Sequence, residues 1–306
     1  MERQIVDTLV TMYETTNSEE RGRLYQELNN FSRNKIEFMM YLLQALRQDF
    51  TIKEKLSVSI FFKTYLNNLI MKKEINAEER KGIFMEILKS DPSVMVHLTP
   101  TIESILFFDE ADAVGTHHLM EVLFAQMRDN INDVNSGSEI DRIRMFFALF
   151  RAAVNVIQDN AILDEKVKEF KDILASAAEK SLEQLRVCYT NSNLEEAKVY
   201  IGLVFEFTTI LREISGKVSK ENNFHHVHIN LFTSDNLIKL MNSIIFLGFP
   251  TDKVFSSTGN DMIDEKVFNS KINMIKILSY MITLIKPHLH MNNLVDTEFE
   301  KLLKSC

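Results

Sequence analysis

Residues that make turns and crosslinks are scarce in this chain of 306 residues, which contains 8 Gly, 4 Pro, 2 Cys and no Trp. A sheet-rich fold needs many tight turns, and those turns depend on Gly and Pro, so their shortage argues against it. The two cysteines, Cys188 and Cys306, form neither a disulfide framework nor a CxxC pair. We therefore expect a helical protein of a reducing, intracellular compartment.

The chain also lacks an excess of positive charge and any long hydrophobic run. Lys and Arg number 35 against 43 Asp and Glu, a formal net charge of -8. General nucleic-acid binding requires a basic face, so this balance argues against it and suits basic partners better. No apolar run reaches the roughly 20 residues that span a membrane, and the N-terminal MERQIVDTLV is too polar for a signal peptide. We expect a soluble protein with neither a membrane nor a nucleic-acid partner.

Catalytic motifs are missing as well. The sequence contains no GxxxxGK[ST], GxGxxG, GxSxG or HExxH, the patterns of phosphate cradles, nucleophile elbows and zinc proteases. One metal-like cluster consists of His225, His226 and His228 with Glu221 nearby, and a solvated loop explains it better than a metal site. We predict a non-enzyme without a cofactor; an enzyme would require a metal bound in this histidine loop.

What the chain does have is apolar periodicity of 3.6 residues, with 45% hydrophobic and 25% charged residues. The pattern predicts about a dozen helices with short connections. Ser18, followed by carboxylates, is predicted to cap the second helix, and Asn76 is predicted to cap the fifth. After a first helix through Ile5 and Tyr13, the predicted helices begin at 18 and then span 35–48, 52–72, 76–89, 93–108, 113–129, 138–158, 160–188, 194–215, 234–247, 263–286 and 294–304.

Helical hairpins of roughly 40 to 47 residues have the length of HEAT or armadillo repeats, which stack because one pair cannot cover its own apolar faces. The predicted fold is therefore all-α, a right-handed α-solenoid of about six or seven HEAT-like hairpins. A closed helical bundle is the alternative. Pro100 is predicted to bend or locally open its helix. The cluster Phe146, Phe147 and Phe150 fits either core packing, which we favour, or a peptide-binding stripe.

The first 110 residues resemble a known family. In order, and at nearly the same spacing, the chain offers SEERGRLYQELNNF, FMMYLLQALRQ, EKLSVSIFFKTYL, NAEERKGIFMEILKSDP and PSVMVHLTPTIESILFFD. This series resembles the N-terminal region of the importin-β superfamily, the karyopherins, and most closely the branch of importin-7 and importin-8. There are departures: Met95 stands where the family has Arg, and FDEADA replaces a turn that carries Trp.

The resemblance implies a binding surface. In this family the inner helices of the first repeats hold the GTP-bound form of the small GTPase Ran. Carried onto this chain, those helices are 19–33, 52–70 and 93–108. The family's YLKN-like segment aligns near Lys63 and Asn67 in the second of these helices. These two residues and, from the neighbouring helices, three more are the expected Ran-binding residues: Arg23, Glu27, Lys63, Asn67 and Glu103.

The resemblance also implies a function, that of a nuclear transport receptor. Such a receptor would bind Ran-GTP, carry basic protein cargo, and contact Phe-Gly nucleoporins as it shuttles between cytoplasm and nucleus through the nuclear envelope. We expect residues 1–110 to form the importin-β-like, Ran-binding part and residues 111–306 to continue the HEAT-like repeats. Family members are several times longer, so the chain is expected to be the N-terminal part of one or a shortened descendant. The alternative is a non-catalytic HEAT-repeat adaptor within a larger assembly.

Overall fold

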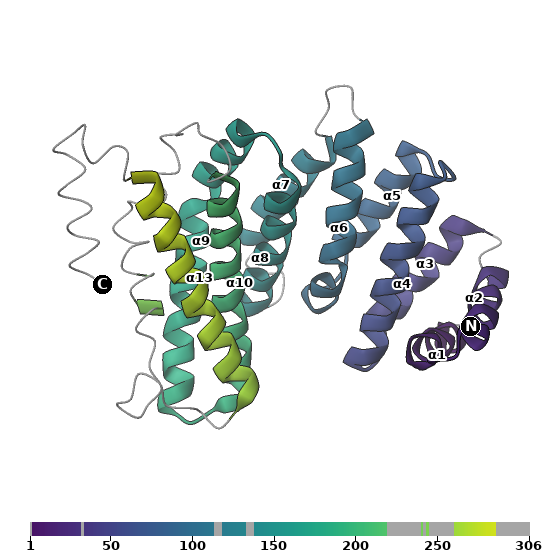
Figure 1. Cartoon of the computed structure of the whole chain (residues 1–306), viewed down its shortest axis with the longest axis horizontal. Helices are drawn as coiled ribbons and strands as arrows, with labels where there is room; N and C mark the ends of the chain where they lie inside the picture. The colour runs from purple at the N-terminus through teal and green to yellow at the C-terminus, as the bar shows by residue number, and fades with distance from the viewer. Residues whose placement is uncertain are drawn as a thin grey trace. The chain divides into compact units, whose positions relative to one another are not determined.

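The computed structural model describes residues 2–31, 34–112, 118–132, 138–218, 240, 243–244 and 260–285. Every regular element in these ranges is an α-helix, which confirms the predicted all-α class (Figure 1). The predicted helix at 234–247 lies mostly outside the described ranges, and both the helix at 294–304 and the histidine loop lie wholly outside them. The helices are α1 Glu2–Glu14, α2 Ser18–Phe31, α3 Lys35–Arg47, α4 Ile52–Met71, α5 Ala77–Leu88, α6 Pro92–Asp112, α7 His118–Asn132, α8 Glu139–Val156, α9 Asn160–Thr190, α10 Leu194–Val218 and α13 Asp261–Ile285.

The chain divides into two compact units, Met1–Val156 and Ile157–Cys306. The first holds α1 to α8, and the second holds α9, α10 and α13. The expected division at residue 110 comes from the family resemblance rather than from compactness, and this residue lies inside α6. That division stays a prediction.

Local capping explains why the predicted helix starts are close to the observed ones. Asn76 accepts a hydrogen bond from the Glu79 N–H at 2.9 Å, and the Glu79 carboxylate accepts the Asn76 N–H at 2.8 Å. This reciprocal capping box confirms the predicted cap of α5. The predicted cap of α2 is wrong by one residue, because the Asn17 side chain, and not Ser18, accepts the N–H groups of Glu19 and Glu20. Asn and Ser cap equally well, so composition alone did not separate them.

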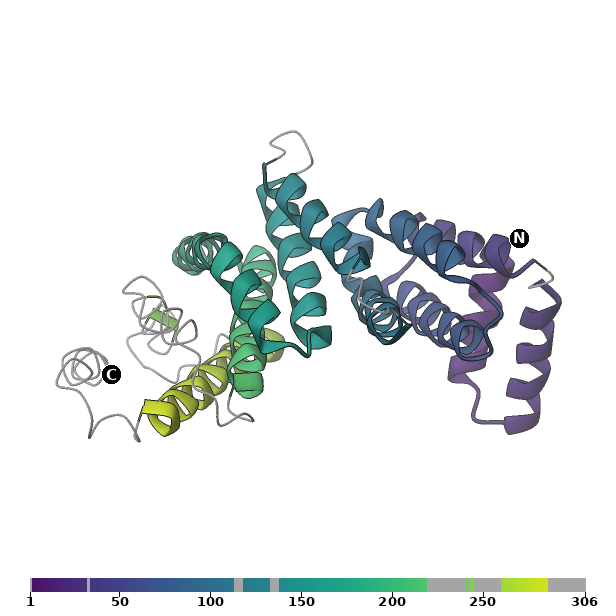
Figure 2. The same ribbon diagram turned by 90° about the horizontal axis from the view of Figure 1, so that it is seen from above.

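In the first unit, consecutive helices pair and the pairs pack in order (Figures 1 and 2). Helix α3 packs against α4, α5 against α6, and α7 against α8. Helix α4 also packs against α1 on one side and α6 on the other, and α6 in turn packs against α8. The helices α4, α6 and α8 therefore form one layer, and the pairs α3–α4, α5–α6 and α7–α8 follow one another along the chain.

Aromatic side chains fill the core of this unit. Phe146, Phe147 and Phe150 are each at most 2% exposed, so the preferred interpretation of this cluster as core packing is confirmed. Phe146 and Phe150, one helical turn apart, stack with ring centroids 5.7 Å apart. Helix α6 continues through Pro100 without ending, and the Ser104 hydroxyl donates to the Pro100 carbonyl at 3.0 Å.

The second unit is built on longer helices. Helix α10 packs against both α9 and α13. Its buried side includes Phe207, which has no exposed surface. Cys188, on α9, is buried and carries a free thiol.

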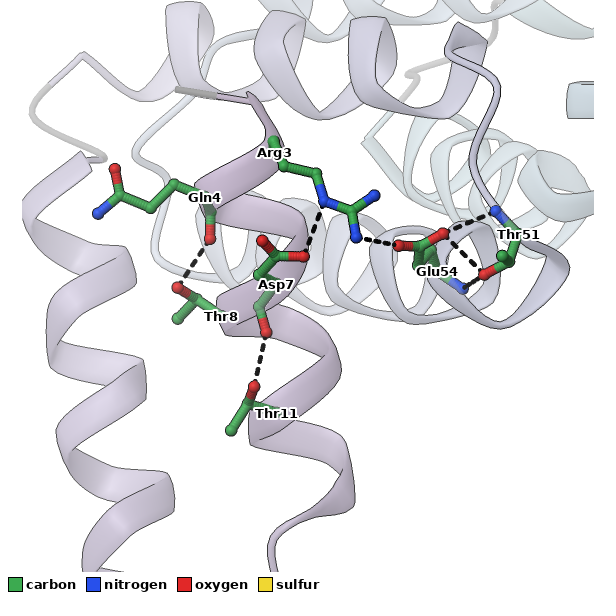
Figure 3. Close-up of polar contacts among 7 residues, drawn as sticks. All are labelled: Arg3, Gln4, Asp7, Thr8, Thr11, Thr51 and Glu54. Carbon is green, nitrogen blue, oxygen red and sulfur yellow. Dashed lines mark hydrogen bonds and ion pairs between the residues drawn. The ribbon is translucent and has the colours of Figure 1, made fainter.

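The start of α4 is tied both to its own cap and to α1 (Figure 3). The Glu54 carboxylate accepts hydrogen bonds from the N–H and the hydroxyl of Thr51, both at 2.7 Å. Its other oxygen lies 2.9 Å from the Arg3 guanidinium on α1, and Arg3 also pairs with Asp7 at 3.0 Å. The Thr51 hydrogen bonds, followed by the Arg3 charge, hold the pKa of Glu54 below its usual value.

We expect Thr51→Ala to destabilise the chain by about 1 kcal/mol, because the substitution removes the N-cap hydroxyl of α4. Urea unfolding followed by far-ultraviolet circular dichroism measures the change. The control is Thr11→Ala on α1, where an exposed hydroxyl bonds, among the residues that the structure describes, to the Asp7 carbonyl of its own helix. An equal loss in both variants would contradict a capping role for Thr51.

Candidate partner-binding surface

Lys63 and Asn67, the two residues expected at the centre of the binding surface, lie one helical turn apart on α4. Both are half-buried. The same side of the helix carries Leu56 and Ile60, which are 49% and 44% exposed. The solvent-facing side of α4 is therefore partly apolar, with Lys63 as the charged group beside Ile60.

Asn67 lies where α4 meets α6. Its Nδ2 atom donates a hydrogen bond of 3.5 Å to the Ser104 hydroxyl of α6. Its Oδ1 atom is buried and has no hydrogen-bond partner among the described residues. A buried amide oxygen without a partner costs stability, so Asn67 is held at this junction of α4 and α6 at some energetic cost.

Glu103 lies next to Ser104 and connects α6 to α8. The Asn155 side-chain amide on α8 donates a hydrogen bond of 2.7 Å to Glu103 Oε1. Together, Asn67, Ser104, Glu103 and Asn155 form a polar row that crosses α4, α6 and α8 in order. The structure thus places Glu103 next in sequence to Ser104, the residue that Asn67 contacts.

Arg23 and Glu27 lie on α2, apart from this polar row. Helix α2 faces α4 through Tyr25, whose ring centroid is 6.4 Å from that of Phe61. At 100° per residue, a residue two positions before or after Tyr25 points to the opposite side of α2. Arg23 and Glu27 therefore point away from α4, and a role for them in partner binding stays a prediction.

The sequence-based list of site residues omits the exposed apolar ones. Phe107 on α6, one turn beyond Glu103, is 54% exposed, and Ile60 on α4 is 44% exposed. The signal in the sequence was the i, i+4 series Ile52, Leu56 and Ile60, which continues to Lys63 and Asn67 near the same side of α4. We call the set Leu56, Ile60, Lys63, Asn67, Glu103 and Phe107 the α4–α6 surface.

His97, half-buried on α6, has its pKa lowered by burial and by the charge of Lys55 on α4. Within the described ranges, no three His, Cys, Asp or Glu side chains gather where a metal ion could be held. The helices described there also include none long and apolar enough to cross a bilayer.

The chain was compared with known proteins at the level of family, sequence and structure. No family model, no curated protein and no solved structure matches it. The resemblance to the importin-β superfamily therefore rests on the ordered motifs of residues 1–110.

Proposed function

We propose that this chain is a non-catalytic helical-repeat binding protein, an importin-β-like nuclear transport receptor with a right-handed α-solenoid of HEAT-like hairpins. The observation that supports the proposal is the packing order of the first unit. Helices α4, α6 and α8 lie side by side, each with its preceding helix packed against it. Such an arrangement buries the apolar face of each pair against the next and leaves one edge of every inner helix open to a partner.

The α4–α6 surface supplies the chemistry for Ran-GTP. Leu56, Ile60 and Phe107 offer apolar area, and Lys63 offers a positive charge one turn from the half-buried amide of Asn67. Interfaces of this kind concentrate their energy in a few desolvated anchors, with charges that set orientation and encounter rate. Basic cargo would bind the later repeats, and Phe-Gly nucleoporins would bind the receptor during passage. Because linkage is reciprocal, cargo that Ran-GTP expels must weaken Ran-GTP binding by the same factor.

The combined variant Lys63→Glu with Asn67→Ala is expected to weaken Ran-GTP binding at least tenfold, because it reverses one interface charge and truncates the polar side chain one turn away. Co-precipitation with immobilised Ran, loaded with a non-hydrolysable GTP analogue, measures the loss. Circular dichroism should stay unchanged, because both side chains are only half-buried.

The control variant is Lys168→Glu, which reverses an exposed charge on α9 in the second unit. It should bind Ran-GTP as the unaltered chain does. Equal capture of the double variant would contradict the assignment of the α4–α6 surface, and unfolding of the double variant would show that its two positions serve the core instead.

A HEAT-repeat adaptor that holds a larger assembly together is the second candidate. The exposed apolar side chains of the α4–α6 surface favour it, because a permanent subunit covers such groups more completely than a partner that must dissociate. A partner that co-purifies on this surface whatever the nucleotide state of Ran would support the adaptor. Release of the bound partner by Ran-GTP would support the transport receptor.

A further inference from the structure

A cavity of about 440 Å³ opens between the α1–α2 hairpin and α4. This volume falls within the range of small ligand-binding pockets. Its lining is largely aromatic, with Tyr13 from α1, Tyr25 from α2, and Phe61 and Tyr65 from α4. Tyr25 meets Phe61 edge to face, and Phe61 stacks on Tyr65 with centroids 5.8 Å apart. The side chains of α4 thus form a rigid apolar wall.

The cavity has one charged group among the described residues that line it, Arg21 on α2. The Arg21 Nη2 atom donates to the Thr15 carbonyl at 2.7 Å, which holds the guanidinium beside the loop between α1 and α2. A guanidinium has five N–H donors, so this bond leaves donors available for a carboxylate. Glu20, the neighbouring acid, accepts the Thr15 hydroxyl at 2.9 Å and is not part of the lining.

Gly22 leaves the α2 side of the cavity unobstructed. This residue lines the cavity, and a Cβ added to it would meet no atom within 4 Å. Glycine is a poor residue for a helix interior, and because Gly22 lines the cavity we expect a long side chain here to occupy part of it. A larger residue at this position therefore provides a direct way to fill the cavity without disturbing the packing around it.

We propose that this cavity binds a short segment of a partner protein in which a large apolar side chain stands next to a carboxylate. The aromatic wall receives the apolar group, and Arg21 pairs with the acid. Tyr13 and Tyr25 at the rim are each 41% exposed, so the cavity is open at its side and a peptide can continue past it in both directions. An enclosed small-molecule site would cover its ligand more fully. The inference concerns a site separate from the α4–α6 surface and does not depend on Ran binding.

Two short peptides, each added to the full chain, test the proposal. Both have one phenylalanine in a run of glycine and serine; in one it is followed by glutamate and in the other by lysine. So short a ligand is expected to bind with a dissociation constant on the order of 0.1–1 mM. Nuclear magnetic resonance of methionine methyl groups detects binding at this strength. Met12 lines the cavity, and Met127, buried on α7, serves as the internal reference.

The glutamate peptide should shift the Met12 methyl signal and leave Met127 unchanged, and the lysine peptide should bind at least several-fold more weakly. Gly22→Leu should abolish the Met12 shift. Gly82→Leu, an equally unobstructed glycine on α5 outside the cavity, should preserve it. Arg21→Gln should weaken the glutamate peptide about tenfold and remove the preference over lysine, as loss of a charge-assisted hydrogen bond predicts. Arg186→Gln, on α9, should change nothing.

Equal shifts with both peptides in the unaltered chain, or no shift with either, would overturn the proposal. So would undiminished binding by Gly22→Leu. If that variant fails to fold by circular dichroism, Arg21→Gln still decides the question, because its exposed side chain is not part of the core.

Discussion

Replacing Phe62 with alanine is expected to lower the free energy of unfolding by about 3–5 kcal/mol. Phe62 has no exposed surface, and its helix α4 packs against α1, α3 and α6. Removing the ring takes away the burial of a large apolar group and leaves a cavity that three neighbouring helices cannot readily close. Urea unfolding followed by far-ultraviolet circular dichroism gives the change, since the chain has no Trp to report by fluorescence.

Ile60→Ala is the matched control for this prediction. Ile60 lies two residues earlier on the same helix, but 44% of its surface is exposed. Its truncation should cost roughly 1 kcal/mol or less, as for most partly exposed positions. Similar losses for the two variants would contradict the structure, in which Phe62 faces the core and Ile60 faces the solvent.

Asn273→Leu is expected to destabilise the second unit by about 2–3 kcal/mol, although leucine is apolar and close in size. Asn273 is 2% exposed on α13. Its amide nitrogen donates to the hydroxyls of Thr208 at 3.2 Å and Thr209 at 3.4 Å on α10, and its oxygen accepts from the Arg212 guanidinium at 3.1 Å. A leucine would leave the Arg212 donor without this acceptor, and bury apolar atoms against both hydroxyls.

Phe268→Ala on the same helix removes more atoms but should cost far less, because that side chain is 60% exposed. Hydrogen exchange resolved by mass spectrometry locates the effect. Faster exchange in α10 and α13 is expected for Asn273→Leu. A larger loss of stability from Phe268→Ala than from Asn273→Leu would contradict the importance of the buried amide network.

Sequence periodicity was sufficient to find the helices in the described part of the chain, because apolar spacing and caps are local signals. Asn76 with Glu79 forms a capping box that is visible in the sequence, and α5 begins where this pattern predicts. The burial of Phe146, Phe147 and Phe150 was likewise expected from their place in an apolar helix. These features depend on residues within a few positions of one another, so no knowledge of the tertiary fold is needed.

Contacts between helices could not be predicted from the sequence. The partner of Asn67 is Ser104, 37 positions away, and nothing local to either residue indicates the other. The direction in which α2 presents Arg23 depends on how Tyr25 packs against Phe61, which is a tertiary contact. Ile60 is apolar and lies in an apolar helix, so the sequence alone suggests a core residue. In the described part of the chain, however, no neighbour covers this side of α4 fully. The sequence therefore predicted residues of a candidate site, but not which of them share one surface.

The most direct test of the proposed function is the affinity of the whole chain for Ran in its two nucleotide states, measured by isothermal titration calorimetry. Ran loaded with a non-hydrolysable GTP analogue should bind about a hundredfold more tightly than Ran loaded with GDP, which is within the usual range of coupling between two ligands of one protein. That preference should fall when Lys63 and Asn67 are replaced together. Equal binding of the two nucleotide forms, or no binding of either, would contradict a role as a Ran-dependent transport receptor.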